Sequence, residues 1–485
     1  MLNILFSIFY KSKTYFKHRF FQITNIIILT QITSENFVFL HRNMDKTIST
    51  KEIWRIAVPI MIGGLAQTLI TFTDTAFLGH LGVIALGASM MAGMYYFVFT
   101  TMAMGLAIGI QIIIARRFGA QEYNKIGSIF QHGAASILIF GLLLFAIMWI
   151  FSSPLLDFII ASDSIYAGAM EYINVRQFGI VFVCFNYLFR SLYTGLSNTK
   201  VITYSTVLMA TVNIILDYCL IFGHGGLPEM GIAGAALASL IAEITATTFF
   251  FVYTYITLGK REYELFKPHG INKDLIINIF KIATPTMFQK LFSFSAWFIF
   301  FIMVEKMGEQ AIGISSIARS VYMILFIPVF GFLATSNTLT SRIIGAGHAD
   351  KVLSTVFRIV FNCILCCIPL ILVCIFFPTT VMSIYTDDMV LANAAIPSIY
   401  VICGAILFQA MGAVIFESVS GTGNTNAALW LEFGILILYI VYVWILTGIT
   451  TKVEWVWTCE YIYGGLIALV SIIYIKFANW QKLKI

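Results

Sequence analysis

The sequence predicts an all-α polytopic membrane protein with twelve transmembrane helices in two parallel six-helix repeats. Composition is the first observation behind this prediction, because 60% of the 485 residues are hydrophobic and only 11% are charged. The second is a series of apolar runs of about 20 residues, the length that crosses a bilayer as a helix. The third is that the two halves of the chain repeat. In a chain built for a lipid bilayer, a formal net charge of +6 is no indication of nucleic-acid binding.

Residues 1–50 differ from the rest of the chain, and we expect them to form a cytosolic N-terminal extension. They combine basic residues with an apolar run, 23–30, that is too short to span a membrane. No small-residue cleavage site follows that run, so it does not resemble a signal peptide. Met44 directly precedes a polar stretch. We therefore expect either a disordered extension or translation that begins at Met44.

Twelve apolar runs follow and predict the transmembrane helices in order. They divide into an N-lobe of residues 51–258, a cytosolic linker of residues 259–273, and a C-lobe of residues 274–485 with a short cytosolic tail. The runs are 54–79, 87–114, 127–151, 166–189, 200–222, 231–257, 274–303, 311–339, 353–377, 391–417, 426–447 and 454–476.

Basic residues concentrate in alternate loops between these runs. Arg116 and Arg117 follow the second run, and Lys260 and Arg261 lie in the linker, whereas the opposite loops carry few basic side chains. The excess of Lys and Arg in cytoplasmic loops orients most membrane proteins. Both termini and the linker are therefore predicted to be cytoplasmic.

The two halves repeat at a constant offset of 226 residues. The matched positions carry proline, glycine, arginine and an Asn-Thr pair. They include Pro59 and Pro285, Gly105 and Gly331, Arg116 and Arg342, and the pairs 198–199 and 424–425. Each half holds six spans, an even number, so both enter the membrane in the same direction. This predicts a pseudo-two-fold axis along the membrane normal, as in many secondary transporters.

Asp74 interrupts the first apolar run. A carboxylate at membrane depth costs roughly 2.5–3.5 kcal/mol on insertion scales, so it usually marks an ion pathway or a polar partner. Its repeat mate is Phe300, and the repeat mate of Asp217 in the fifth run is Val443. Because the scaffold is doubled but these acids are not, we predict a single ion-coupling site in the N-lobe.

Asp74, Asp217, Asn213 and Ser239 are predicted to lie at similar depth. Asp74 and Asp217 both lie about 7–8 Å inside the outer ends of their runs, at 1.5 Å per residue. Asn213 precedes Asp217 by one turn, Ser239 lies in the sixth run, and Glu243 follows Ser239 by four residues. Carboxylate, amide and hydroxyl oxygens suit a proton relay or a sodium ion. Asn213 and Ser239 have the alternative of an ordinary interhelical hydrogen bond, and Glu243 that of facing a central cavity.

The second half carries cations at membrane depth, Lys290 in the seventh run and Arg319 in the eighth. Each either pairs with a carboxylate or a carbonyl, snorkels to water, or lines the substrate cavity and tunes its charge.

From Lys51 onward the chain resembles the multidrug and toxic compound extrusion (MATE) antiporters, and its first motif resembles the DinF branch in particular. Four motifs carry the resemblance. They are Asp74-Thr-Ala-Phe-Leu-Gly-His-Leu-Gly82, Leu196-Ser-Asn-Thr-Lys200, Asn213-Ile-Ile-Leu-Asp217 and Gly231-Ile-Ala-Gly-Ala-Ala-Leu-Ala-Ser239. The resemblance implies H⁺ or Na⁺ coupling at Asp74, Asn213 and Asp217, with Ser239 where that branch often has threonine. It implies no other metal and no cofactor.

The resemblance also implies how such a protein works. Pro59 would be the hinge of the first span, and Pro285 is its repeat mate. We expect a monomer in the bacterial plasma membrane that exports small amphiphilic or cationic organic compounds by alternating access between the lobes. The alternative within the same superfamily is a flippase for lipid-linked oligosaccharides or other amphiphiles.

The second half departs from the NorM branch of the family, which is expected to carry acids in spans seven and ten. Those positions here are Ser293 and Gln409, both neutral, so Gln409 is only a candidate cavity residue. Glu417 and Glu432 lie near the cytoplasmic ends of their runs. They are interpreted as solvated or paired helix-end charges.

The sequence does not predict an enzyme. Cys363, Cys366 and Cys367 have helical spacing, but no histidine or carboxylate nearby completes a metal site. The histidines are scattered over loops and span ends, with no metalloprotease spacing and no phosphate-binding loop.

Overall fold

The computed structural model describes residues 48–259, 262–383, 385 and 389–483. The chain separates into two compact units, Met1–Ser49 and Thr50–Ile485, and the second unit is the subject of all that follows. The predictions about Met44 and most of the N-terminal extension fall outside the described residues.

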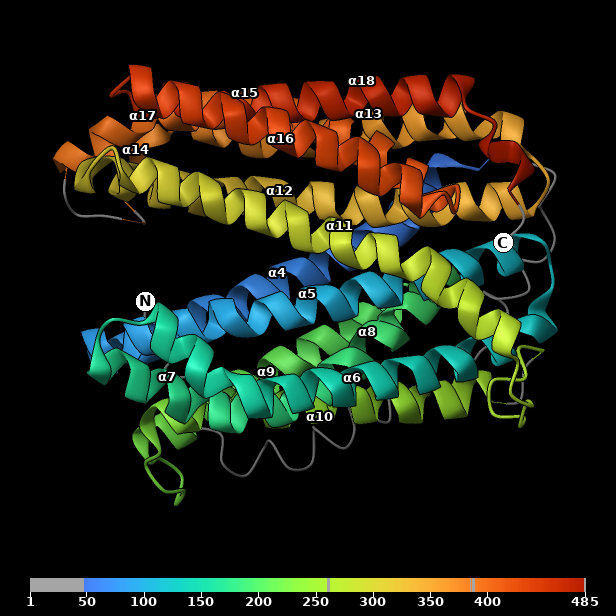
Figure 1. The fold of residues 1–485 in the computed structure, drawn as a ribbon, viewed down its shortest axis with the longest axis horizontal. Coiled ribbons are helices and arrows are strands. Elements are labelled where there is room, and N and C mark those ends of the chain that lie inside the picture. The colour runs from blue at the N-terminus through green and yellow to red at the C-terminus, as the bar shows by residue number, and fades with distance from the viewer. Residues whose placement is uncertain (1–47, 260–261, 384, 386–388, 484–485) are drawn as a thin grey trace. The chain divides into compact units, whose positions relative to one another are not determined.

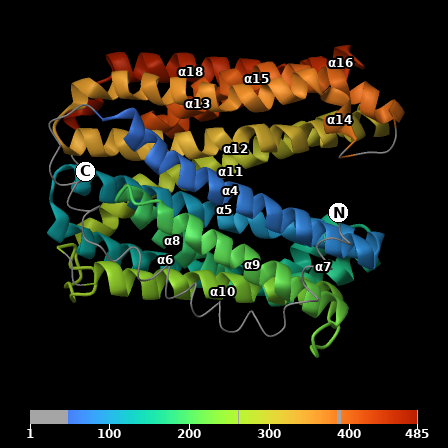
Figure 2. The same ribbon diagram turned by 180° about the vertical axis from the view of Figure 1, so that it is seen from behind.

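All regular structure in the described part of the chain is helical, which confirms the predicted class (Figures 1 and 2). The first half contains α4 (Thr50–Leu81), α5 (Val83–Gly119), α6 (Tyr123–Ile159), α7 (Asp163–Arg176), η1 (Gln177–Gly179), α8 (Ile180–Gly195), α9 (Lys200–Phe222) and α10 (Gly231–Leu258). The second half contains α11 (Lys273–Glu305), α12 (Glu309–Gly345), η2 (Ala349–Lys351), α13 (Val352–Phe376), α14 (Pro378–Met382), α15 (Met389–Gly421), α16 (Thr425–Ile449), α17 (Val453–Val456), α18 (Cys459–Phe477) and η3 (Trp480–Lys482).

Eleven helices in the described residues are long and apolar enough to cross a membrane. The fourth predicted span is the exception, since it is broken into α7, η1 and α8. The break lies beside Arg176 and Gly179. A side chain on Gly179 would collide with the Arg176 guanidinium and with the carboxylate of Glu243. The short 3₁₀ turn and the glycine therefore make room for a charged pair inside this span.

The helices form two groups (Figures 1 and 2). We call α4–α10 the N-lobe and α11–α18 the C-lobe. The ribbons of the two lobes lie close together where α5 and α12 end, and they diverge toward the opposite end. Contacts between the lobes come from α5 against α11 and α12, and from α4 against α12.

Repeat-related glycines bring the lobes into contact where α5 and α12 end. A Cβ on Gly119 would overlap the carbonyl oxygen of Arg342, and a Cβ on Gly345 would overlap that of Arg116. Only glycine permits backbones to approach so closely. Gly119 and Gly345 are separated by the repeat offset, so the same contact is made twice across the pseudo-two-fold axis.

Two repeat-related arginines reach across the same contact. Nη2 of Arg116 donates to the carbonyl oxygen of Thr422 at 2.8 Å. Nη1 of Arg342 donates to Glu52 at 2.5 Å and lies 3.5 Å from Oγ of Ser197. We call this end of the molecule the arginine end and the opposite end the Asp74 end.

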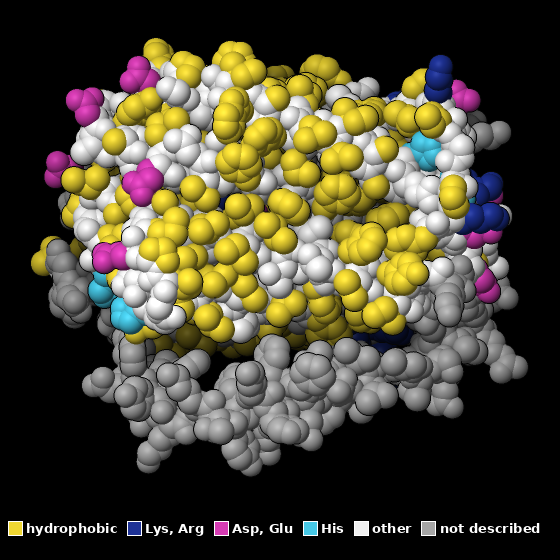
Figure 3. Space-filling view, turned by 90° about the horizontal axis from the view of Figure 1, so that it is seen from below, with side chains coloured by type: hydrophobic (Ala, Val, Ile, Leu, Met, Phe, Trp, Pro, Cys, Tyr) yellow, Lys and Arg dark blue, Asp and Glu magenta, His cyan; other side chains and the backbone are white. Residues whose placement is uncertain are grey.

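The surface has the distribution expected of a membrane protein. On the face in Figure 3, hydrophobic side chains cover the middle of the molecule, and most of the visible Lys and Arg side chains lie toward one end. An apolar band between polar ends is the surface that a bilayer covers.

Pro59 lies inside α4, where it cannot donate a hydrogen bond to the carbonyl of Arg55. The hydroxyl of Thr199 donates to the carbonyl oxygens of Arg55 and Ile56, at 3.3 and 2.9 Å. The hydroxyl of Thr203 donates to the carbonyl of Pro59 at 2.7 Å. Side chains of α9 and of the turn before it therefore supply the donors that this stretch of α4 needs.

Candidate ion-coupling site and C-lobe cavity

The structure brings Asp74 of α4 and Asp217 of α9 together. Their carboxylates lie within hydrogen-bonding reach of each other, and Asp217 is fully buried. Both oxygens of Asp217 and Oδ1 of Asp74 are buried and have no donor among the described residues. Two ionised carboxylates cannot donate to each other, so the pair requires a proton or a cation to satisfy it.

Asn213 and Ser239 adjoin this pair. Nδ2 of Asn213 lies 3.4 Å from Oγ of Ser239, which joins α9 to α10. Oδ1 of Asn213 is buried and has no donor in the described part of the chain. The interhelical hydrogen bond foreseen as an alternative is thus present, yet it leaves the amide oxygen available. Oxygens of this kind are the ligands that hard cations prefer.

An apolar cluster covers the site on its Asp74-end side. Leu78 follows Asp74 by one turn and Ile221 follows Asp217 by one turn, and both pack with Ala235 of α10. All three are buried, so the carboxylates lie beneath a hydrophobic layer. A dry environment strengthens electrostatic interactions between the groups inside it.

Arg176 of α7 is a functional-site neighbour that the sequence analysis missed. Its guanidinium binds both oxygens of Glu243, at 2.6 and 2.5 Å, and lies 3.2 Å from the hydroxyl of Tyr96. It also lies within electrostatic range of Asp74. An arginine inside the fourth apolar run was the signal that could have revealed it, because such a charge needs a partner.

Glu243 is held in an ion pair with Arg176, and its alternative of facing a central cavity stays a prediction. It is buried and held by the bidentate ion pair with Arg176, and its backbone carbonyl accepts from Asn186 at 3.1 Å. The helical repeat placed Glu243 near Ser239, but spacing alone could not show that an arginine on α7 occupies both of its oxygens.

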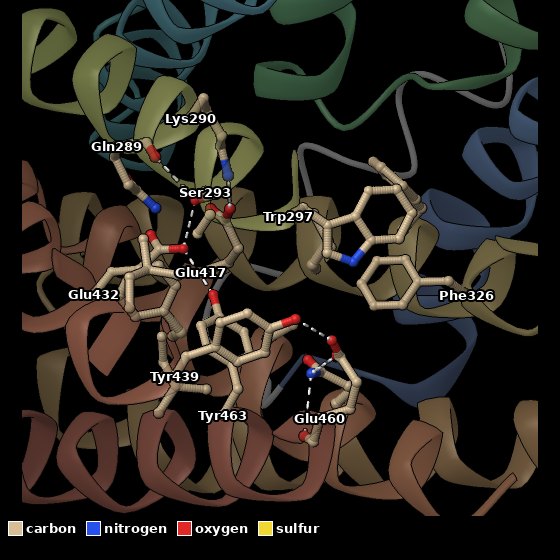
Figure 4. Close-up of a pocket in the computed structure, with 18 of the residues that line it drawn as sticks. Gln289, Lys290, Ser293, Trp297, Phe326, Glu417, Glu432, Tyr439, Glu460 and Tyr463 are labelled. Atoms are coloured by element: carbon tan, nitrogen blue, oxygen red, sulfur yellow. Dashed lines mark hydrogen bonds and ion pairs between the residues drawn. The ribbon is translucent and has the colours of Figure 1, made fainter. Parts of the chain in front are cut away.

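The C-lobe contains a cavity of about 260 Å³ (Figure 4). Lys290 and Glu417 form an ion pair at its edge, with Nζ and Oε1 2.7 Å apart. Aromatic side chains make much of the remaining wall. They are Trp297, Tyr322, Phe326, Phe330, Phe416, Tyr439 and Tyr463.

Two more carboxylates line this cavity. Glu432 accepts from the hydroxyls of Ser293 and Tyr463, each at 2.7 Å, while its Oε2 has no donor in the described residues. Glu460 of α18 accepts from Nε2 of Gln409 at 2.7 Å, and from the hydroxyls of two tyrosines. Ser293 and Gln409, the neutral residues at the two positions where acids were expected, thus each donate to a carboxylate from another helix.

These observations correct the sequence interpretation of the C-lobe. Glu417 and Glu432 are buried and hydrogen-bonded, so of the two alternatives solvation is wrong and pairing is right. Together with Glu460, they place three carboxylates around the C-lobe cavity, although the residues at the two expected acidic positions are neutral. Glu460 lies inside the last apolar run, where its charge was visible but was not considered.

The two cations predicted at membrane depth have different positions. Lys290 lines the cavity and pairs with Glu417. Arg319 is outside the set of described residues that line it, and its guanidinium lies 5.4 Å from the centre of the Phe301 ring. Lys290 and Gln409 therefore line this cavity, whereas a cavity position for Arg319 stays a prediction.

A family model, MatE, matches the chain twice, over residues 59–219 and 285–445. The chain belongs to the MatE family. The two matched segments are related by the 226-residue offset, which confirms the predicted repeat. MATE proteins are transporters and not enzymes. As a member of the family, this chain is a transporter.

Several curated relatives are bacterial and are named probable multidrug resistance protein NorM. The protein from Thermotoga maritima is 25% identical over 79% of this chain and 82% of its own length. The protein from Photorhabdus laumondii is 24% identical over 78% of this chain and 83% of its own length. These names belong to the NorM branch, so the DinF-like assignment stays a prediction.

Solved MATE structures share the fold. A crystal structure of MATE in complex with MaL6 superimposes with a TM-score of 0.82 at 21% identity, covering 89% of this chain and 97% of that one. An outward-facing multidrug resistance MATE transporter gives a TM-score of 0.80 at 20% identity, covering 90% and 97%. The twelve-helix, two-repeat membrane architecture is thereby confirmed, with the fourth span as the broken helix α7–α8.

Proposed function

We propose that this MATE transporter exports small amphiphilic or cationic organic compounds in exchange for H⁺ or Na⁺. Two lines of support converge on this proposal. Its relatives are named as probable multidrug resistance proteins. Its N-lobe also holds a pair of neighbouring carboxylates with buried oxygens that lack a donor in the described chain, which supports cation binding there.

The Asp74–Asp217 pair carries the proposal. These carboxylates approach each other beneath an apolar layer, and three of their four oxygens lack a donor in the described chain. A proton would let one carboxylate donate to the other. Alternatively, a sodium ion would take oxygens from both carboxylates and from Asn213 as ligands. The same pair can thus serve either ion.

Orientation follows from charge. The arginine end carries the basic loop residues, so the positive-inside rule makes it cytoplasmic, together with both termini and the linker. The Asp74 end then faces outward, and the coupling ion enters from that side of a plasma membrane. The lobes are joined at the arginine end and diverge at the Asp74 end, which corresponds to an outward-open arrangement.

Alternating access requires the ion to favour one lobe arrangement over the other. Only a difference in affinity between the two arrangements shifts their populations. Pro59 and the side-chain donors around it place a weakened stretch of α4 about four to five turns from Asp74. Bending there when the carboxylates are occupied would change how α4 packs against α12, and hence how the lobes meet. Pro285 holds the equivalent position in α11.

The test is uptake into vesicles that contain the purified protein, driven separately by a pH gradient and by a sodium gradient. Asp74→Asn and Asp217→Asn should each abolish ion-driven transport without loss of expression. Asp163→Asn, the same substitution at an exposed position of α7, is the matched control and should transport normally. Undiminished transport by Asp74→Asn would overturn the assignment.

The flippase alternative receives less support. A cavity for lipid-linked phosphates should be strongly basic. The C-lobe cavity instead combines one lysine, already paired with Glu417, with two further carboxylates.

A further inference from the structure

We propose that Gln111 and Asn337 are positioning residues that couple the Lys290–Glu417 pair in the C-lobe cavity to the closed interface between the lobes. The inference rests on the alternating access proposed above. It assigns a role to four polar side chains that the Asp74 site does not use: the buried Gln111, Asn337 and Glu417, and the partly buried Lys290.

Gln111 of α5 and Asn337 of α12 meet across the lobe interface. They are separated by the 226-residue repeat offset, so they occupy the same position in the two repeats and face each other at the pseudo-two-fold axis. Nε2 of Gln111 lies 3.3 Å from Oδ1 of Asn337 and 3.1 Å from the hydroxyl of Thr338. Both amides are buried, so separating the lobes here would strip their hydrogen bonds.

Asn337 also connects to the cavity. Its Nδ2 donates to Oε2 of Glu417 at 3.1 Å, and the other oxygen of Glu417 accepts from Nζ of Lys290 at 2.7 Å. Lys290 and Glu417 line the cavity, as Figure 4 shows. Four side chains therefore form one continuous chain of hydrogen bonds from the cavity to the axis.

In this series of hydrogen bonds, each side chain orients the next one. A carboxylate only accepts, so Glu417 orients the Nδ2 group of Asn337 toward itself. That orientation turns Oδ1 of Asn337 toward Gln111, where it meets a donor. If Glu417 loses its charge or its place, the amide of Asn337 is no longer held, and the donor of Gln111 is left without this acceptor in a buried interface.

A cation or a proton that enters the cavity would compete with Lys290 for Glu417. The interface would then lose the hydrogen bond that keeps Asn337 in register with Gln111. Occupancy of the C-lobe cavity would in this way weaken the closed arginine end. The N-lobe site acts through α4, so the two lobes would influence the same interface by separate routes.

The test is hydrogen exchange of the wild-type protein and its variants in lipid nanodiscs, read at residues 112–119 and 338–345. Glu417→Gln and Lys290→Met should both raise exchange in these two segments about 10-fold, the effect expected of a lost hydrogen bond to a charged group. Lys290→Arg keeps the ion pair and should restore protection. Glu460→Gln changes a carboxylate of the same cavity outside the chain, and should leave both segments unchanged.

Gln111→Ala, Asn337→Ala and the double variant complete the test. If the two amides act as one unit, the double variant exchanges no faster than either single variant. The proposal is overturned if Gln111→Ala raises exchange while Glu417→Gln and Lys290→Met do not, or if Glu460→Gln raises it equally. Hydrogen exchange measures opening of the lobes and not transport. A result that overturns this proposal is therefore distinct from a failure of Asp74→Asn to abolish efflux.

Discussion

The Arg176 guanidinium donates to Glu243 and Tyr96, and it lies within electrostatic range of Asp74. Arg176 and Glu243 are both largely buried, with side-chain exposures of 12% and 10%. A buried pair adds little net stability, but removing one partner leaves a charge without compensation. The pair thus holds α7 to α10 at a fixed place next to the carboxylates.

Arg176→Met should therefore destabilise the protein by about 3–5 kcal/mol, because it leaves Glu243 buried and unpaired. Replacing both partners, with Arg176→Met and Glu243→Leu, should recover much of this loss. Thermal unfolding of the purified protein in detergent measures the difference. Arg117→Met removes one partner of the more exposed Arg117–Glu122 pair, and should cost at most about 1 kcal/mol. Equal losses for Arg176→Met and Arg117→Met would contradict this account.

The sequence predicted the neighbours of a residue where both residues lie on helices whose direction through the membrane was also predicted. Depth along α4 and α9 placed Asp74 beside Asp217, since both helices run the same way. The partners of Glu243 and Glu417 could not be located in this way. Which face of α7 or α11 turns inward depends on tertiary packing, and hydropathy does not specify it where all faces are apolar.

At the scale of elements, α4 is a continuous helix that contains a proline, Pro59, and neighbouring residues outside α4 supply hydrogen-bond donors to that stretch. The hydroxyl of Thr199 compensates for the N–H that Pro59 lacks, because it donates to the carbonyl oxygens of Arg55 and Ile56. Thr199 belongs to the Asn-Thr motif that the sequence singled out. Its role in supporting Pro59 became visible only when the turn before α9 was placed against α4.

Thr199→Val should cost about 1–3 kcal/mol, because the buried carbonyl of Ile56 and the partly buried carbonyl of Arg55 then lose the donor that Thr199 supplies. The cost should shrink in a Pro59→Ala background, where residue 59 regains an N–H for the carbonyl of Arg55. Denaturant unfolding of the four proteins gives the coupling energy. Thr211→Val, on the exposed side of α9, is the control and should change stability by about 0.5 kcal/mol or less. A coupling energy of zero would show that the two residues act independently.

At the scale of the whole molecule, the repeat explains why the lobes meet symmetrically. Gly119 and Gly345 each pack against the backbone of the other repeat, and Arg116 and Arg342 each reach across. Hydropathy and the constant offset were sufficient to predict this architecture. They could not predict the C-lobe cavity, because its carboxylates come from α15, α16 and α18 at positions that do not follow the repeat.

Gly119→Ala and Gly345→Ala should each loosen the arginine end, since the added Cβ collides with a backbone carbonyl that cannot move aside. Overpacking of this kind costs about 1–3 kcal/mol, so the population opened at this end should rise about 10-fold or more. Hydrogen exchange at the end of α5 reports the change. Gly93→Ala, in the same helix with open space around it, should exchange like the wild type. Unchanged exchange in Gly119→Ala would contradict the description of this contact.

The central claim is that Asp74 and Asp217 together bind the ion that drives export. Ion and substrate must then weaken each other's binding by the same factor. The most direct measurement is the affinity for the fluorescent cation ethidium, by anisotropy, as proton and sodium concentrations are varied separately. We predict that one of these ions weakens ethidium binding to the wild type, and that this dependence is lost in the variant carrying Asp74→Asn and Asp217→Asn. A double variant that keeps the wild-type ion dependence would contradict the claim.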